Sequence, residues 1–366
     1  MDGELWALLI PIVNADNEAF LHAGGSLEDS ERATAQIAVA ESYLESRVNG
    51  PNFPSTTGAA ADGALPISYG YVVAEAGEKG LGAFAIQDFH RGDLILTDPP
   101  LFLVDEPNHN RKVTLRNIMI AVQKLSHAEK RAFVSLKNAH SGSKLVDNPI
   151  IGIYYTNAFE AGNGSAICVA ASRFNHSCLP NARYSWHAAS GRMRIYALRE
   201  IAVGEEIFVS YLSGRKVYGS CHKDRQKELK RYIFTCACIA CSLPSLEQAA
   251  SDARRKEIAR IWDSVPLYMP HQTADRLTAI IRAIRLLEEE GYPADADDFT
   301  NDAAAICACH GDWESVRYWA TKTYETRVAE FGEDSHRAAE VKNSYLDLKK
   351  SPHAETQRKQ IFTARL

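Results

Sequence analysis

The sequence predicts an α+β protein, with a middle region of short strands set between helical segments. Three observations support this fold class. From residue 69 onward, short runs of β-branched and aromatic residues alternate with glycine-containing turns. A single helical pattern interrupts these runs, and helical periodicity returns after residue 243. Because strands and helices do not alternate regularly, a doubly wound parallel sheet of the Rossmann type is not expected.

The middle region contains seven predicted strands and one helical insert. The insert is expected at residues 101–149, with a helix over 114–138 that carries Leu115, Ile118 and Val122 on one face. The strands are expected at residues 71–75, 83–86, 94–97, 150–155, 166–170, 193–197 and 206–211.

The two ends of the chain read as helical. Residues 1–48 predict a helical segment, and residues 49–67 predict a linker because they are rich in Gly, Pro, Ser and Thr. Beyond the middle region, Ser335 is a candidate N-cap for the last predicted helix. Small and aromatic residues alternate in this part, which suggests antiparallel helix pairs of tetratricopeptide type. The C-terminal helices are expected at residues 252–264, 273–290, 297–309, 313–330 and 336–349.

Composition and charge limit the classes of function. The chain has 366 residues, of which 46% are hydrophobic, and we expect two or three domains. Its net charge of −5 argues against direct binding to nucleic acid. The apolar run at residues 6–13 is too short to span a bilayer and lacks the basic flank of a signal peptide. We therefore expect a protein of the cytoplasm or nucleus that is not associated with membranes.

Three of the eight cysteines lie close together, at Cys236, Cys238 and Cys241. Thiolates at this spacing can bind one zinc ion, but a tetrahedral site needs a fourth ligand from elsewhere. The alternatives are three core cysteines, or a redox pair between the last two. A redox motif of the thioredoxin kind would require a βαβ setting, which this sequence lacks. The sequence therefore favours a zinc site.

Three other motifs could serve a ligand or only the fold. The loop at residues 172–181 is dense in Asn, His, Ser and Cys, which suits ligand or metal binding as well as a capped turn. Gly80 and Gly82 allow a backbone to approach a ligand closely, or they form a hairpin turn. Tyr211 closes a strand as either a functional or an edge-strand aromatic residue.

Several other polar residues are expected to have no functional role. Glu205 and Glu206 are expected at a surface turn. Cys221 and His222 are expected in a solvated loop. The third group is Cys307, Cys309 and His310, for which helical packing is favoured over metal binding because positions two apart on a helix do not face each other.

In their order and spacing these motifs resemble the SET-domain methyltransferases, in the branch related to the SET-and-MYND-domain (SMYD-like) lysine methyltransferases. The resemblance covers about residues 68–243. It assigns residues 68–215 to a SET domain, 216–243 to a zinc-binding post-SET segment and 244–366 to a helical domain. No cysteine precedes Cys168, so the MYND zinc finger is missing. The motifs that carry the resemblance are residues 80–82, 156–159, 175–181, 204–211 and 236–241.

The resemblance implies a set of site residues. Cys178 would be the fourth ligand of one structural zinc ion, beside Cys236, Cys238 and Cys241. Tyr211 and Tyr232 would be the catalytic residues. S-adenosylmethionine would be the cofactor, leaving as S-adenosylhomocysteine. Its binding residues would be Lys79, Gly80, Leu81, Gly82, Asn157, Asn175, His176, Tyr211 and Phe234.

The implied activity is transfer of a methyl group to a lysine of a protein substrate, histone or non-histone. The C-terminal helices could in addition bind a protein partner. Two alternatives remain open at this point. A SET-fold enzyme can act on a small-molecule acceptor, and a non-catalytic scaffold can bind the cofactor and recruit partners.

Overall fold

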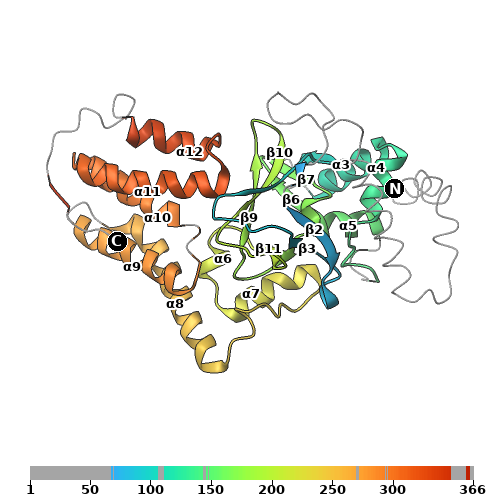
Figure 1. Ribbon diagram of the computed structural model, residues 1–366, viewed down its shortest axis with the longest axis horizontal. Helices are drawn as coiled ribbons and strands as arrows, with labels where there is room; N and C mark the ends of the chain where they lie inside the picture. The colour runs from blue at the N-terminus through green and yellow to red at the C-terminus, as the bar shows by residue number, and fades with distance from the viewer. Residues whose placement is uncertain are drawn as a thin grey trace.

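The computed structural model describes residues 67–68, 70–105, 111–142, 146, 148–268, 272–292, 294, 296–347 and 360–362. The helical segment expected at residues 1–48, and nearly all of the linker expected at 49–67, lie outside these ranges. In the described part, strands occupy the centre, with one group of helices at one end and a larger group at the other (Figure 1). The α+β class is thus confirmed.

The first sheet has four antiparallel strands in the order β1-β4-β10-β9. A β-bulge between Ile195 and Tyr196 interrupts its β4–β10 pairing. The alternate residues of β10 that face inward, Met193 and Ile195, are fully buried. The strands are β1 (Ile67–Ser68), β4 (Leu94–Asp98), β10 (Arg192–Ala197) and β9 (Ala182–His187).

The second sheet, in the order β2-β3-β11-β8, contains one parallel pair. There Phe208 is paired with Asn175, and Val209 with His176. Because parallel strands run in the same direction, the residues that follow both strands emerge side by side. This pairing brings the loop after residue 176 next to residues 210–212. The strands are β2 (Tyr71–Glu75), β3 (Leu81–Ala85), β11 (Glu206–Val209) and β8 (Asn175–His176).

The third sheet packs against the insert helices. Its strands, in the order β5-β7-β6, are β5 (Phe102–Asp105), β7 (Gly164–Ile167) and β6 (Ala158–Ala161). The helices are α3 (Arg111–Lys124), α4 (His127–Val134) and α5 (Pro149–Asn157). Phe102, Ile118 and Phe133 join sheet and helices in one buried cluster.

Two expectations in the insert are wrong. The helix expected over 114–138 is two helices, because Ser126 and Glu129 form a capping box that begins α4. The strand expected over 150–155 is the helix α5. The side chain of Asn148 accepts hydrogen bonds from the backbone N–H groups of Ile150 and Ile151, and Pro149 occupies the first turn. This N-cap overrides the β preference of the isoleucines.

The C-terminal helices agree closely with the sequence pattern. Ser335 accepts a hydrogen bond from the backbone N–H of Ala338 and is the expected N-cap. Each of these helices packs against the next along the chain. None of the helices that the structure describes is long and apolar enough to cross a membrane. The helices are α8 (Ser245–Ser264), α9 (Thr273–Glu289), α10 (Ala296–Cys309), α11 (Trp313–Phe331) and α12 (His336–Val341), with a π-helical turn at Lys342–Leu346.

Buried and half-buried ion pairs join the C-terminal helices to the first sheet. Glu330 of α11 has no exposed side-chain surface and accepts a hydrogen bond of 2.7 Å from Arg183 of β9. Arg194 of β10 makes a bidentate pair with Asp334, with distances of 2.6 and 3.0 Å. The helical part is therefore fastened to the strand region.

Two short helices connect the strand region to these C-terminal helices. They are α6 (Lys216–Gly219) and α7 (His222–Leu229). The solvated loop expected at Cys221 and His222 is wrong, since Cys221 is buried at the N-terminus of α7 and donates to Asp224 at 3.0 Å. Helix α7 lies beside the cysteine-rich segment that follows it.

Candidate functional site

Four cysteines from two distant segments meet at one point. Cys178 follows strand β8, whereas Cys236, Cys238 and Cys241 lie beyond α7; together they are called the four-cysteine group here. Their sulfur atoms all lie within 4.8 Å of one another. The Sγ of Cys178 is 4.0 Å from that of Cys236 and 3.6 Å from that of Cys241. All four thiols are free, so no disulfide accounts for this proximity.

The geometry of the four-cysteine group fits a tetrahedral metal site. Zinc–thiolate bonds of about 2.3 Å hold sulfur atoms roughly 3.8 Å apart in a tetrahedron. The measured separations of 3.6 and 4.0 Å lie on either side of that value. Hydrogen bonding among the thiols lowers the pKa of Cys238 and Cys241 and raises the pKa of Cys178 and Cys236, so metal binding would have to displace protons from the latter two.

His176 connects the four-cysteine group to Tyr211. Its Nδ1 accepts a hydrogen bond from the backbone N–H of Tyr211 at 2.9 Å, and its Nε2 lies 3.3 Å from the Sγ of Cys178. Burial lowers the pKa of His176 to about 4, so the imidazole is neutral near pH 7. An accepting Nδ1 places the proton on Nε2, directed at the sulfur. Both ring nitrogens are therefore used within the protein.

Tyr211 lies at the centre of an aromatic cluster. Its ring centroid is 5.3 Å from His176, 5.0 Å from Tyr232 and 6.4 Å from Phe234. The Tyr211 hydroxyl donates to the carbonyl oxygen of Phe174 at 3.1 Å. Burial, and then the proximity of Tyr232 and Glu206, raise the pKa of Tyr211. The phenol therefore stays protonated, and its oxygen keeps lone pairs that can accept.

The residue between Tyr232 and Phe234 has an unusual backbone. Ile233 has φ 58° and ψ 38°, the left-handed conformation, although its side chain is β-branched and 59% exposed. Among the described non-glycine residues it alone has a positive φ. Such a conformation is costly for an isoleucine and persists where the surroundings enforce it. Here it turns the chain so that both flanking rings contact Tyr211.

Three residues that the sequence analysis did not assign to the site extend the cluster. Arg231 donates to the carbonyl oxygen of Tyr211 at 3.1 Å and to the hydroxyl of Tyr232 at 2.9 Å. Tyr184 of β9 stacks edge-on against Phe159, with ring centroids 5.1 Å apart. Burial, followed by the proximity of Tyr232, raises the pKa of Tyr184 to about 12. Strands β6 and β9 thus add rings to one side of the cluster.

Glu206 joins the glycine turn to the loop that contains His176. Its Oε1 accepts from the side-chain amide of Asn175 at 2.8 Å, and its Oε2 lies 2.5 Å from the Nζ of Lys79. Its side chain is only 10% exposed, so the expectation of a surface residue is wrong. The sequence alone does not reveal these contacts of Glu206, because its partners come close to it only through the pairing of β11 with β3 and β8.

The two glycines of the turn have different surroundings. An added Cβ at Gly82 would lie 2.6 Å from Glu206 Oε1 and 2.9 Å from Asn175 Nδ2, so a side chain does not fit there. At Gly80, which has a φ of +82°, nothing lies within 4 Å of such an atom. Leu81 accepts from the Asn175 amide through its carbonyl oxygen at 2.9 Å. The backbone is open at Gly80 and closely packed at Gly82.

Asn157 makes its hydrogen bonds within the helical insert. Its amide donates to the carbonyl oxygens of Lys137 and Ile153, at 2.8 and 2.7 Å, at the end of α5. These bonds fix its side chain to the backbone of the insert, and its expected contact with the cofactor stays a prediction.

Comparison with known proteins identifies a domain family for the middle of the chain. A family model described as SET domain matches residues 80–212. The Histone-lysine N-methyltransferase set5 of Schizosaccharomyces pombe is 27% identical over 285 residues, which cover 77% of this chain and 85% of that protein.

Shorter matches link the chain to human SMYD proteins. The Protein-lysine N-trimethyltransferase SMYD5 of Homo sapiens is 36% identical over 24% of this chain and 21% of that protein. The N-lysine methyltransferase SMYD2 of Homo sapiens is 34% identical over 25% of this chain and 20% of that protein. This chain thus matches about a fifth of the length of each SMYD relative. Residues 80–212 of this chain therefore match a SET domain, and the chain is similar to the set5 and SMYD methyltransferases.

Proposed function

We propose that this protein is an S-adenosylmethionine-dependent methyltransferase that acts on lysine side chains of a protein substrate and contains one structural zinc ion. The observation that carries the proposal is the chain of contacts from the four-cysteine group through His176 to Tyr211. These contacts connect a residue expected to bind the metal, a residue expected to bind the cofactor and the tyrosine expected to be catalytic. Relatives that are named as lysine methyltransferases support the reaction type.

The cofactor would be held between the glycine turn and the aromatic cluster. When bound, S-adenosylmethionine supplies an electrophilic methyl group on a sulfonium sulfur. The open backbone at Gly80 suits close contact with a ligand, and the neighbouring amide of Asn175 is already oriented by Glu206. Phe234 offers an aromatic face suited to a flat base. Because both ring nitrogens of His176 are used, its imidazole would position Tyr211, and any bond to the cofactor would come from its main chain.

The acceptor would enter beside the rings of Tyr184, Tyr211 and Tyr232. A lysine amine is protonated in water, with a pKa of about 10.4. A dry aromatic surrounding and a nearby positive charge disfavour the ammonium form, so the amine loses its proton to solvent before it reacts. The exposed guanidinium of Arg231, bonded to Tyr232, adds to this effect.

The protein's contribution to the transfer would be chiefly positional. Transfer of a methyl group to an amine would require the amine to be aligned with the bound cofactor, and these residues would supply that alignment. The Tyr211 hydroxyl, fixed by its bond to Phe174, presents an acceptor oxygen that orients the amine. With its pKa raised by burial, Tyr211 does not serve as a general base at neutral pH.

Zinc would have a structural role. A site closed by four thiolates leaves no position for substrate or water, so the ion would fasten the segment around Phe234 to the loop around His176. We expect loss of zinc to disorder the cofactor-binding surface before it affects the remote sheets.

A transfer experiment with methyl-labelled cofactor tests the proposal. The purified chain is incubated with a cell lysate and, separately, with lysine-containing peptide arrays. Label in protein or peptide supports the proposal. Label confined to the small-molecule fraction would favour an enzyme of small acceptors, and cofactor binding without any transfer would favour a scaffold.

A further inference from the structure

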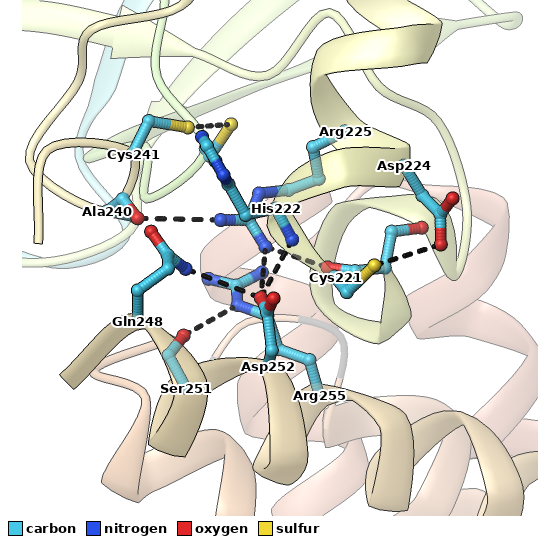
Figure 2. Close-up of polar contacts among 12 residues, drawn as sticks. Cys221, His222, Asp224, Arg225, Ala240, Cys241, Gln248, Ser251, Asp252 and Arg255 are labelled. Atoms are coloured by element: carbon cyan, nitrogen blue, oxygen red, sulfur yellow. Dashed lines mark hydrogen bonds and ion pairs between the residues drawn. The ribbon is translucent and has the colours of Figure 1, made fainter. Parts of the chain in front are cut away.

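Arg225 lies directly behind the four-cysteine group, on helix α7. Figure 2 shows it between Ala240, the neighbour of Cys241, and Asp252 of α8. Its side chain has no exposed surface. The Nη1 atom donates to the carbonyl oxygen of Ser220 at 2.7 Å, and Nη2 donates to that of Ala240 at 3.4 Å.

A fully buried guanidinium needs a negative partner. Asp252 is 3.9 Å from Arg225 Nη1, beyond hydrogen-bond length, and accepts instead from the backbone N–H of His222 at 2.7 Å. The Nε atom of Arg225 has no hydrogen-bond partner among the described residues. Carbonyl oxygens satisfy polarity but do not neutralise the charge. The ion pair of Arg225 with Asp252 is thus long, and the carboxylate is shared with the backbone of His222.

The four-cysteine group would supply a second negative partner for Arg225. A zinc ion with four thiolates carries a net charge of about −2. The guanidinium of Arg225 reaches the carbonyl oxygen of Ala240, the residue directly before Cys241. The position of Arg225 and the negative charge expected of the four-cysteine group are therefore complementary.

Arg225 is backed by the C-terminal helices. Next to it, Arg255 of α8 is 2% exposed and donates to Glu290, at the end of α9, at 2.8 Å. Arg255 also donates to the carbonyl oxygen of Val217 at 2.9 Å. Glu290 also accepts from Arg254 at 2.5 Å, so this carboxylate is shared by two arginines other than Arg225. The layer behind the cysteines is formed by α7, α8 and α9.

We propose that Arg225 is a positioning residue for the metal site. Its cation balances the thiolates of Cys178 and Cys241 and makes zinc retention depend on the packing of α8 and α9. This inference rests on the zinc site of the proposed function, but not on the methyl transfer. A role limited to holding the backbone at Ser220 and Ala240 would not require charge, and this difference makes the inference testable.

The experiment compares zinc affinity in full-length variants under reducing conditions. Zinc dissociation constants are measured by competition with a chromophoric chelator for wild type, Arg225→Met and Arg225→Lys. The matched control is Arg327→Met, which removes another buried arginine, 6% exposed and paired with Asp297 at 2.9 Å, from α11. Absorption of the cobalt(II)-substituted proteins shows whether all four thiolates still bind.

We expect Arg225→Met to weaken zinc binding by about 10- to 100-fold, as for other groups that support metal ligands, with the tetrathiolate cobalt spectrum retained. Arg225→Lys keeps the charge and should recover most of the affinity. Arg327→Met should stay within about twofold of wild type, because distant sites are nearly independent.

Wild-type affinity in Arg225→Met, or equal weakening in Arg225→Lys and Arg225→Met, would overturn the role of the charge. Should Arg225→Met not fold, Arg225→Gln replaces it in the comparison with Arg225→Lys. Absence of zinc binding in the wild type would overturn the zinc site itself, a failure that is separate from any failure of methyl transfer.

Discussion

The backbone N–H of Tyr211 donates to the imidazole Nδ1 of His176 at 2.9 Å, across 35 positions of the sequence. The parallel pairing of β8 with β11 makes this contact possible, because it places Val209 opposite His176. The other ring nitrogen of His176 reaches Cys178 at 3.3 Å. Tyr211 is therefore oriented by a histidine that also contacts Cys178 of the four-cysteine group, and disturbance of the cysteines is expected to reach the tyrosine.

Cys178→Ser tests this link. A serine hydroxyl is a poor zinc ligand, so zinc per chain should fall well below one and cofactor affinity should fall with it. Metal analysis and calorimetric titration of S-adenosylmethionine measure the two effects. Cys168→Ser is the matched control, since Cys168 is fully buried in the core between the sheets and outside the four-cysteine group. Full zinc retention in Cys178→Ser would show that it is not a ligand.

Phe234→Ala should weaken cofactor binding. Stacking of a base on an aromatic side chain contributes about 1–3 kcal/mol when measured by alanine substitution, so we expect the dissociation constant to rise at least about fivefold. Ile239→Ala is the control, because Ile239 lies in the same segment with a 71% exposed side chain. Equal cofactor affinity in both variants would remove Phe234 from the binding surface.

Ile233→Asn should stabilise the fold. Asparagine tolerates the left-handed conformation that costs an ordinary residue about 1–2 kcal/mol, and the exposed isoleucine loses little burial. Thermal unfolding should show a higher midpoint for Ile233→Asn and no rise for the control Ile239→Asn. A lower midpoint for Ile233→Asn would mean that the isoleucine side chain makes contacts worth more than the strain.

Asp334→Asn should lower stability in a pH-dependent manner. The hydrogen bond from Arg194 holds the pKa of Asp334 below its usual 3.8. The carboxylate therefore stabilises the fold above pH 3.8, and the effect is lost as pH falls through the lower folded-state pKa. Because Asp334 is 59% exposed, we expect no more than about 1 kcal/mol.

Urea unfolding of both proteins measures this effect. The difference between wild type and Asp334→Asn should be constant between pH 8 and pH 5 and should shrink below about pH 4. A difference that disappears already at pH 6 would assign it to another group.

Sequence periodicity predicted the regular elements well where packing and local preference agree. The strand at residues 71–75 and the helix beginning at residue 313 are predicted correctly. In both, the spacing of apolar residues and the positions of the turn-forming residues indicate the same boundaries. The prediction failed at residues 150–155, where one asparagine and one proline outweigh a run of β-branched and aromatic residues. Short caps of this kind are easily missed beside a strong apolar pattern.

The candidate site was only partly predictable. Cysteine spacing indicated a metal, and the resemblance supplied Cys178 as the missing ligand. Glu206 and Arg231 could not be found in this way, because each looks like an ordinary surface charge and contacts a residue distant in sequence, Asn175 and Tyr211 respectively. The commitment of the His176 ring to Tyr211 likewise depends on strand pairing, which a single sequence does not reveal.

The most direct test of the central claim is the rate of methyl transfer to protein lysine by wild type and by Tyr211→Phe, with the modified atom located by tandem mass spectrometry. We expect methyl groups on lysine Nζ with wild type, and a rate at least about 100-fold lower in Tyr211→Phe, because loss of one orienting hydroxyl has effects of that size. Tyr196→Phe, which removes a hydroxyl bonded to Arg194 in the first sheet, should keep the wild-type rate. Equal rates in Tyr211→Phe and wild type, or methyl groups on no lysine, would contradict the proposed active site.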